Sequence, residues 1–483
     1  MRHDAAAATC ETVPRTPSHA NTFALAPALS REFLLHHRLC PKRFSDDGAV
    51  VVARTTDALC GALDDISRVY ERACIAEIVA RDELEQLIER LTTRSERDIE
   101  LARADLAGDD PGDHFAADVR DLAAQPPVIR YVNLLVREAY DAAASDIHLE
   151  TTRSGLAVRF RIDGLLTSAP EPPGEFHQAV LSRIKLLADL DIAERRRPQD
   201  GRIRVRLETR ELDIRVSTVA TMLGESVVLR LLDQGGRPVT LSELGMSEDV
   251  LASVRQLAGR PHGMLLATGP TGSGKTTSLY AALQQRDAFV EKIITVEDPV
   301  EYQLAGITQM PVHRESGVTF GSALRAILRQ DPDVVMIGET RDAETATIAV
   351  QAAMTGHLVL STLHTNDAIG AIPRLLDLGI PEYLVATTLE GILAQRLVRR
   401  VCDECTGDGC ARCRGTGFRG RIGIFELVVM TDALRDAISA RAPSARLRAI
   451  ANDAGFVTIR ADGSMKVALG LTTLEEVARV VES

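Results

Sequence analysis

The sequence predicts an α/β protein with more than one domain. Between residues 236 and 395, short apolar runs alternate with helical segments, which is the pattern of a parallel sheet covered by helices on both faces. One of these runs leads into a glycine-rich loop at residues 269–277. Earlier in the chain, three short runs at residues 158–163, 202–207 and 212–216 alternate apolar and polar side chains, as in a sheet with one buried and one exposed face. The length of 483 residues suits about three domains.

Composition and residue patterns divide the chain into consecutive segments. The segment rich in Ala, Pro, Ser and Thr at the N-terminus is expected to be disordered. The expected segments are a disordered N-terminus (1–30), a small mixed domain (31–97), a linker (98–125), an α+β domain (126–235), the domain with the glycine-rich loop (236–395), a cysteine motif (396–421) and a C-terminal helical region (422–483).

The small mixed domain carries no catalytic constellation. Residues 48–53 read as a strand, and helical periodicity is expected through Ile75, Ile78 and Val79 and again from Leu84 to Leu91. This domain is either a folded spacer or a module that docks on another protein. We favour docking.

Charge and hydropathy exclude several classes of protein. The net charge of −12 disfavours nonspecific binding to nucleic acid. No run of about 18 apolar residues predicts a transmembrane helix. The first 30 residues lack a basic segment followed by an apolar one, so they do not form a secretory signal. The expected location is cytoplasmic.

The glycine-rich loop has the spacing G-x-x-x-x-G-K-T of a P-loop, between a predicted strand and a predicted helix. Glycines allow backbone N–H groups to curl around phosphate oxygens, and the following helix N-terminus attracts the same anion. We expect Lys275 to reach the β- and γ-phosphates and Thr276 to hold Mg²⁺. The alternative is a glycine-rich turn without a ligand. The predicted nucleotide-binding residues are Gly269, Pro270, Thr271, Gly272, Ser273, Gly274, Lys275, Thr276 and Thr277.

Carboxylates follow two predicted strands of the same domain. Glu297 and Glu339 stand at strand C-terminal ends, where ligands bind in open α/β sheets. Either could polarise the attacking water or hold Mg²⁺ through water. His357 and His364 bracket a further strand and are candidates for sensing the γ-phosphate, although a lone histidine is more often structural.

Arginines form a second group of candidates. Arg325 and Arg329 lie four residues apart on one predicted helix face, which favours an anionic partner. The alternating strands of the α+β domain carry a basic face, and Arg195, Arg196 and Arg197 add to it. This face is either simply solvated or directed at an anion, and we favour the anion. At least one of four arginines is predicted to reach the phosphates across a subunit boundary: Arg159, Arg161, Arg202 and Arg215.

Four of the eight cysteines lie close together. Cys402, Cys405, Cys410 and Cys413 form two tandem C-x-x-C-x-G-x-G units. Four thiolates suit tetrahedral Zn²⁺ with no open coordination position, which is a structural site. The alternative is four free thiols.

Several motifs in order resemble the type II/type IV secretion ATPase superfamily. They are the segments 145–150, 159–164, 197–202, 297–301, 324–345 and 355–366, and the resemblance is strong over about residues 125–480 and weak over 31–97. It implies a RecA-like P-loop ATPase core, a PAS-like second N-terminal domain, and Glu339 as the catalytic carboxylate. The tetracysteine motif departs from the family, whose two C-x-x-C pairs are usually separated by a much longer insertion.

The resemblance also implies a cellular role. It implies a homo-hexamer that hydrolyses ATP with Mg²⁺ and drives pseudopilus assembly and protein export in type II secretion; pilus assembly is the alternative. Residues 31–97 would dock on the cytoplasmic region of an inner-membrane protein, which places the chain peripherally at that membrane. The residues alone also allow two other classes of function: a soluble P-loop phosphotransferase for a small molecule, and a zinc-dependent binding module that holds ATP as a structural ligand.

Overall fold

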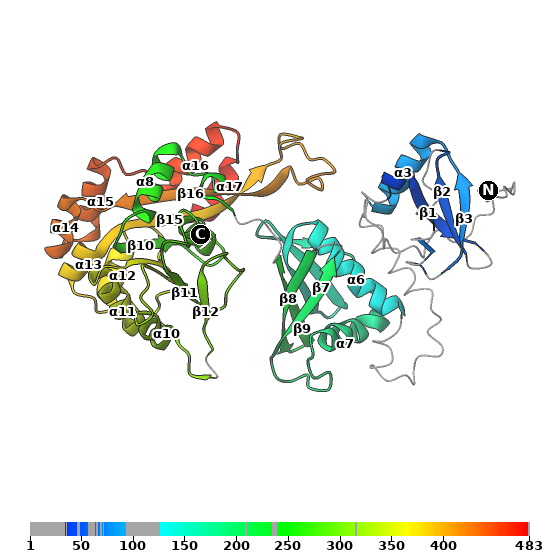
Figure 1. Ribbon diagram of the computed structural model, residues 1–483, viewed down its shortest axis with the longest axis horizontal. Helices are drawn as coiled ribbons and strands as arrows, with labels where there is room; N and C mark the ends of the chain where they lie inside the picture. Colours follow the sequence, from blue (N-terminus) through cyan, green and yellow to red (C-terminus); the bar gives the residue numbers. More distant parts are fainter. Residues whose placement is uncertain are drawn as a thin grey trace, which may run out of the picture.

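The computed structural model describes residues 34, 36–45, 49–56, 63, 66–67, 70, 72–92, 126–207, 210–233, 239–313 and 316–481. The predicted disordered N-terminus (1–30) and the predicted linker (98–125) lie outside these residues. Three units follow one another along the chain: a small N-terminal domain, a second domain and a larger core (Figure 1).

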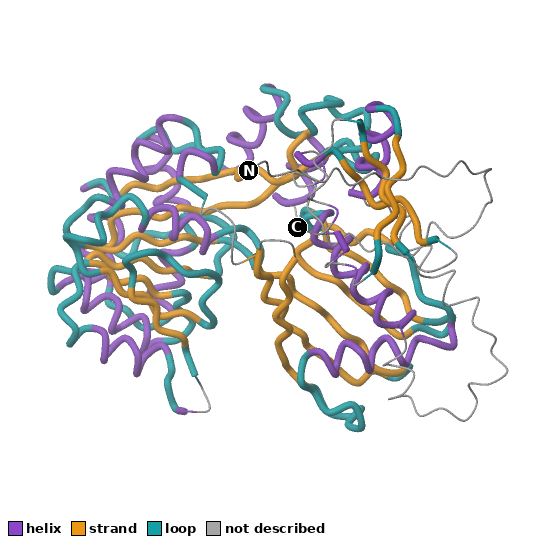
Figure 2. The backbone as a smooth tube through the Cα atoms, turned by 45° about the vertical axis from the view of Figure 1, so that its right-hand side comes forward, coloured by secondary structure: helices purple, strands orange, loops and turns teal. Residues whose placement is uncertain are grey.

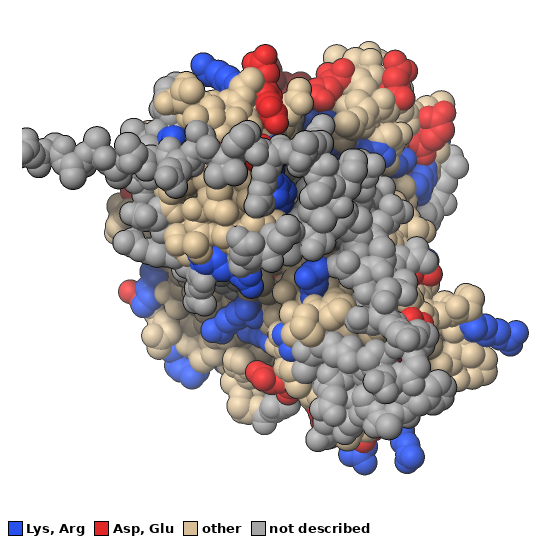
Figure 3. All heavy atoms as spheres, turned by 90° about the vertical axis from the view of Figure 1, so that its right-hand side faces the viewer, with Lys and Arg blue, Asp and Glu red and all other residues tan. Residues whose placement is uncertain are grey.

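The N-terminal domain is a three-stranded sheet with a helix. Strands β1 (Leu39–Phe44) and β2 (Val50–Arg54) pair in antiparallel orientation. Strand β3 (Cys74–Ile78) pairs with the other edge of β2 and runs parallel to it, and helix α3 (Arg81–Thr92) follows. The helix predicted through Ile75–Val79 is wrong, because this β-branched segment pairs with β2 instead. Figure 3 shows acidic side chains gathered along the upper edge of this side of the molecule.

The second domain is an antiparallel sheet with helices on one side (Figure 2). Its strand order is β6-β5-β4-β9-β8-β7. Apolar residues of the strands pack on α6 and α7, and the alternating pattern of the sequence is thereby explained. The elements are α6 (Pro126–Asp141), β4 (Ala144–Thr151), β5 (Leu156–Ile162), β6 (Leu165–Ser168), the 3₁₀ turn η2 (Gly174–Phe176), α7 (His177–Leu187), β7 (Gln199–Leu207), β8 (Arg210–Thr221) and β9 (Gly224–Asp233).

The core is built on a seven-stranded sheet with the order β12-β11-β13-β14-β10-β15-β16. The strands are parallel except for β16, which is antiparallel to β15. Helices lie on both sides of this sheet (Figure 2), as the sequence predicts. The strands are β10 (Gly263–Thr268), β11 (Ile293–Glu297), β12 (Thr308–Pro311), β13 (Val334–Ile337), β14 (Leu358–Leu363), β15 (Leu389–Val401) and β16 (Phe418–Val429).

The helices of the core fall into two groups. Along the chain, the first group precedes or alternates with the strands up to β15, and the second follows β16 (Figure 1). Strands β15 and β16 run through residues 395 and 421, so the sheet extends across the segment divisions suggested by the sequence. The helical elements are η3 (Leu241–Glu243), α8 (Glu248–Ala258), α9 (Lys275–Leu283), α10 (Phe320–Ile327), α11 (Ala343–Met354), α12 (Ala371–Asp377), α13 (Glu382–Thr388), α14 (Asp432–Ser439), α15 (Ser444–Asp453), α16 (Ile459–Ala468) and α17 (Leu474–Val481).

The β15–β16 hairpin projects from the core (Figure 1). Its strands are paired from Gly391–Val429 to Val401–Phe418, and its tip reaches toward the second domain (Figure 1). None of the helices in the described ranges is long and apolar enough to span a bilayer.

Candidate nucleotide and metal sites

The P-loop joins the buried strand β10 to the helix α9. Gly269, Gly272 and Gly274 have φ values of 144°, 77° and 85°, which side chains rarely tolerate. A Cβ atom at Gly269 would lie 2.6 Å from the backbone oxygen of Gln395. The glycines therefore permit both the tight turn and the close approach of β15. This is the geometry that the spacing predicts for a phosphate cradle.

The side chain of Lys275 lies over the loop. Its Nζ donates hydrogen bonds to the backbone oxygens of Gly269 at 2.8 Å and Pro270 at 2.9 Å. Burial, together with the nearby Arg396 guanidinium, lowers the pKa of Lys275 to about 8. An ammonium held in this buried, positively charged surrounding gains a strong interaction when an anion enters.

Strand β15 supports the P-loop from below. The Gln395 amide donates to the Ser273 backbone oxygen at 2.6 Å, and Arg396 donates to the Asn366 backbone oxygen at 2.8 Å. Arg396 thus connects β15 to the segment that follows β14. The sequence analysis predicts neither residue, because no local motif marks contacts between segments that are 122 and 30 residues apart.

Glu339 follows β13, two residues beyond its last residue. Its Oε2 lies 2.6 Å from Nε of Arg341 and 3.7 Å from Nε2 of His364. The side chain is 17% exposed, so water can reach it from the cavity described below. Burial and the charge of Lys275 lower the pKa of His364, with Glu339 acting in the opposite direction. These three groups form a polar cluster opposite the P-loop.

Glu297 is more deeply buried, at 2% exposure. The Tyr280 hydroxyl donates a hydrogen bond to its Oε2, and Thr295 and Gln309 donate to its Oε1 at 2.5 and 3.1 Å. Burial and this hydrogen bond raise the pKa of Tyr280. The carboxylate is therefore fixed by three donors, one of which comes from the helix of the P-loop.

A cavity of about 1080 Å³ brings these groups together with the second domain. The P-loop, both glutamates, His364 and Arg396 line one side, and Asp146, Arg161 and Arg230 line the other. Arg230 lies 3.0 Å from Asp146, and the Arg161 guanidinium donates to the backbone oxygen of Gly164 at 3.0 Å. The sequence analysis does not predict Arg230. This residue stands between Leu229 and Leu231 in an alternating strand, which is the same pattern that singles out Arg159 and Arg161.

The other predicted arginines lie elsewhere. Arg159 pairs with Glu150 within the second domain. Arg215 is half-buried and donates to the backbone oxygen of Val300 at 3.1 Å, and burial lowers its pKa. Arg202 faces Arg215 in the register of β7 and β8 and is exposed.

Three further candidates have partners inside the core. The Arg325 guanidinium lies 2.5 Å from Glu344, and Arg329 donates to the backbone oxygen of Arg325 at 2.9 Å. His357 directly precedes β14, and its ring hydrogen-bonds the backbone oxygen of Ala352 on α11, whereas His364 follows the end of β14. Of the two histidines, it is His364 that lines the cavity.

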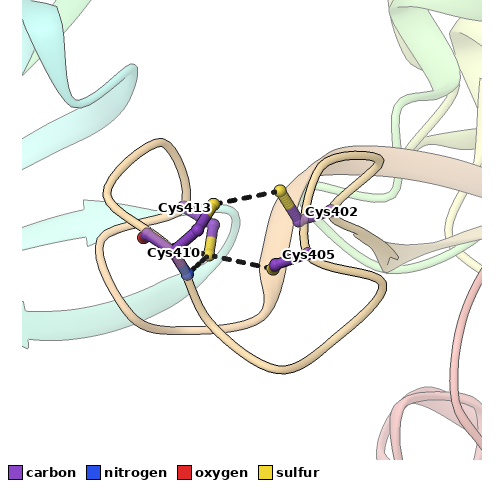
Figure 4. A group of neighbouring side chains, drawn as sticks. All are labelled: Cys402, Cys405, Cys410 and Cys413. Carbon is purple, nitrogen blue, oxygen red and sulfur yellow. Dashed lines mark hydrogen bonds between the residues drawn. The ribbon is translucent and has the colours of Figure 1, made fainter.

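The four clustered cysteines converge at the tip of the β15–β16 hairpin (Figure 4). Sulfur atoms of Cys402 and Cys410 are 3.8 Å apart, those of Cys405 and Cys413 are 3.7 Å apart, and all four lie within 4.8 Å of one another. A tetrahedral ion with metal–sulfur bonds of about 2.3 Å would space its sulfurs by roughly 3.8 Å. The donor set and its spacing therefore fit zinc.

Glycines bring the two cysteine pairs together. A Cβ atom at Gly409 would lie 2.7 Å from the Gly415 backbone oxygen, and one at Gly417 would lie 2.3 Å from that of Gly407. The Gly417 N–H donates to Cys413 Sγ at 3.3 Å, and the Gly409 N–H donates to a second cysteine sulfur. The tandem turns thus pack closely and direct backbone donors at the sulfurs, which favours thiolates.

Comparison with known proteins identifies the family. The model of the family described as type II/IV secretion system protein matches residues 121–479. The chain belongs to this family. This secretion protein is 44% identical over 482 residues to the type II secretion system protein E of Xanthomonas campestris pv. campestris, covering 94% of this chain and 85% of that protein. It is 42% identical over 454 residues to the type II secretion system ATPase E of Vibrio cholerae, covering 87% and 90%.

A solved structure supports the same assignment. The pilus retraction motor PilT with bound ADP matches this secretion protein with a TM-score of 0.51 and 28% identity, covering 72% of this chain and 95% of that chain. The fold predicted from the sequence, a P-loop secretion ATPase core, is thereby confirmed. The curated relatives carry type II names, so the type II interpretation is confirmed in preference to pilus assembly.

Proposed function

We propose that this protein hydrolyses ATP to drive pseudopilus assembly and protein export across the outer membrane in type II secretion. The observation that carries this proposal is the cavity in which the P-loop, Glu339 and basic groups of the second domain meet. A triphosphate placed there would contact a loop of backbone donors on one side and guanidinium groups on the other. A small-molecule phosphotransferase is less well supported, because the relatives named above are secretion proteins.

The residues of the core divide the work of hydrolysis. Lys275, now bonded to two loop carbonyls, would turn to the β- and γ-phosphates, and Thr276 would hold Mg²⁺, which supplies charge neutralisation when bound. Glu339 would orient and polarise the attacking water, a role supported by its position in the lining of the cavity. Glu297 acts as the second carboxylate of the site. His364 contacts Glu339 and would report the presence of the γ-phosphate.

The arginines act on the charge that develops on the phosphates. Arg161 lines the cavity in its own chain and is the candidate that needs no partner subunit. Arg202 is exposed on β7, the edge strand of the second domain, and would serve a neighbouring subunit of a ring. Arg215 positions the segment after Glu297 through its hydrogen bond to the backbone oxygen of Val300.

The cysteine cluster would hold one structural Zn²⁺. All four coordination positions would be filled by Cys402, Cys405, Cys410 and Cys413, which leaves none for substrate. Bound zinc would replace the apolar core that so short a loop cannot build.

The assembly and its partner are also proposed from the family. The protein would work as a homo-hexamer at the cytoplasmic side of the inner membrane, without nucleic acid. Its N-terminal domain would dock on the cytoplasmic region of an inner-membrane secretion protein. In support, β3 is an edge strand in the described sheet, and its Ile75 and Ile78 are 46% and 50% exposed. Such an edge offers both backbone groups and apolar side chains to a partner.

Phosphate release by purified protein tests the enzymatic proposal. Glu339→Gln should bind a fluorescent ATP analogue as the wild type does and release phosphate at least a hundredfold more slowly, because only the water-polarising charge is removed. Lys275→Ala should lose turnover and bind nucleotide more weakly. Wild-type phosphate release by Lys275→Ala would contradict the P-loop assignment. Normal turnover by Glu339→Gln would instead make Glu297 the candidate for the catalytic carboxylate.

Secretion by a strain that lacks the protein tests the export role. The wild-type protein should restore secretion in this strain, and Glu339→Gln should not.

A further inference from the structure

We propose that the tip of the β15–β16 hairpin is a docking element that holds the second domain over the nucleotide cavity. The hairpin tip is defined here as residues 402–421, which include the four cysteines. The inference rests on the proposed zinc site and extends it, since it assigns the metal a role in placing another domain. The partner of this surface is the chain's own helix α6 (Figure 1) together with the β5–β6 turn.

The first contact joins the second cysteine pair to α6. Nη1 of Arg414 lies 2.6 Å from Oε1 of Glu138, whose side chain is 4% exposed. Glu138 lies on the face of α6 that is otherwise lined by buried apolar residues such as Leu135 and Ala139. A carboxylate in such a position strongly favours a nearby cation. Arg414 supplies one from the other side of the domain boundary.

The second contact joins the base of the tip to the β5–β6 turn. The Gly420 N–H donates to Oδ2 of Asp163 at 2.8 Å, and Nε of Arg421 lies 3.9 Å from Oδ1 of the same residue. Asp163 and Gly164 have φ values of 48° and 89°, as a tight turn between two strands requires. The two contacts lie on different elements of the second domain, so together they restrict its rotation as well as its distance.

The metal site determines the geometry of the first contact. Arg414 directly follows Cys413 and has a φ value of 53° in the turn closed by the Gly415 N–H on the Cys410 backbone oxygen at 2.9 Å. Residues 402–417 contain no aliphatic side chain larger than alanine. Such a loop has no apolar core of its own, so cross-linking of its four sulfurs by a metal is what would fix the direction of Arg414.

The docked turn also bears on the nucleotide cavity. Arg161, two residues before Asp163, donates to the backbone oxygen of Gly164 and lines the cavity. Holding the turn therefore holds the base from which Arg161 extends. The hairpin tip would thus transmit the state of the metal site to the phosphate-facing side of the second domain. Arg215, bonded to Val300, provides a separate attachment away from the metal.

Hydrogen–deuterium exchange of the full chain tests the docking. Arg414→Ala and Asp163→Ala should each raise exchange in peptides covering residues 161–168 and 418–422 by roughly tenfold, because an interaction with a partly buried charge is lost. Arg412→Ala is the matched control: Arg412 lies in the same loop but pairs with Glu404 inside it, at 2.5 Å. It should leave both peptides at the wild-type rate.

Zinc content measured on the same samples separates the two proposals. Arg414→Ala keeps all four cysteines and should keep its zinc, so faster exchange in this variant supports docking independently of metal loss. Cys402→Ser with Cys405→Ser should lose zinc and show the same faster exchange of residues 161–168. Exchange unchanged in both Arg414→Ala and Asp163→Ala would overturn the docking role. Wild-type protein without zinc would overturn the metal dependence and the proposed zinc site, while leaving the Arg414 and Asp163 results to judge the contact itself.

Discussion

The Tyr280 hydroxyl, on the helix that begins at the P-loop lysine, donates a hydrogen bond to the Glu297 carboxylate at the end of β11. Tyr302 stacks edge-on against the Tyr280 ring, with centroids 4.7 Å apart. The Tyr280–Glu297 hydrogen bond joins the helix that follows the P-loop to the end of β11. A displacement of α9 would therefore also move the end of β11.

Tyr280→Phe should lower both turnover and stability. Loss of one donor to a buried carboxylate costs about 1–3 kcal/mol, so the free energy of unfolding should fall by this amount and turnover by about tenfold, with nucleotide affinity less affected. Urea unfolding and phosphate release measure the two effects. Tyr383→Phe, at a tyrosine that is 62% exposed on α13, is the control and should match the wild type. Unchanged stability of Tyr280→Phe would show that this hydroxyl is not needed to hold Glu297.

The P-loop and the strand-end carboxylates could be predicted from the sequence because each is a local pattern. The spacing of the glycines around Lys275 predicts its place in the P-loop, and the apolar run before Glu339 predicts its place at a strand end. The support given by Gln395 to the loop could not be predicted, since it joins residues that are distant in sequence. The helix predicted through Ile75, Ile78 and Val79 is the strand β3, because apolar residues three or four apart, such as Ile75 and Ile78, suit a helix when the pairing partner is unknown.

The cysteine cluster gives a prediction about metal content. Purified protein should contain about one zinc ion per chain, and Cys410→Ser with Cys413→Ser should contain none. Elemental analysis measures the ion, and thiol titration of the native protein should find the four clustered cysteines protected. Ala411→Ser, between the same two cysteines, keeps every sulfur and should keep the zinc. Zinc-free wild-type protein with four reactive thiols in the cluster would count against the site.

Glu476 gives a prediction about pH. Burial disfavours its charge, but hydrogen bonds from Arg479 and Arg399 outweigh burial and hold the pKa of Glu476 at about 2, below its ordinary value of 4.5. Because the folded pKa is depressed, the stabilisation is complete above about pH 4.5 and is lost as the pH falls from there toward 2. The carboxylate joins α17 to β15 through Arg399 Nη2 at 2.8 Å.

Glu476→Gln should therefore lower the melting temperature near pH 7, by about 2–4 °C for each kcal/mol of stability that is lost in a domain of this size. The difference from wild type should narrow below pH 4.5. Melting curves at half-unit steps from pH 7 to 3 measure it, with the exposed Glu171→Gln as the control. A difference that stays constant over the whole range would show that the arginines do not depress this pKa.

The position of Arg202 leads to a prediction about the ring. Arg202 is exposed on β7, which ends the strand order of the second domain, and it does not line the cavity of its own chain in the described structure. If it contacts phosphate, it must do so in a neighbouring subunit. Arg202→Ala should then lower turnover by about a thousandfold, as loss of an arginine finger does.

Mixing two inactive variants distinguishes action in trans from action in cis. In a ring assembled from equal amounts of Lys275→Ala and Arg202→Ala subunits, about a quarter of the interfaces combine an intact P-loop with an intact arginine from the neighbour, because a head-to-tail ring uses two different surfaces at each contact. Phosphate release should recover toward that fraction of the wild-type rate. Mixing Lys275→Ala with Glu339→Gln is the control and should recover nothing, since both residues belong to the same P-loop domain. No recovery in the first mixture, with mixed rings confirmed by native mass spectrometry, would place Arg202 outside the neighbour's site and leave Arg161, which lines the cavity of its own chain, to act on the phosphates.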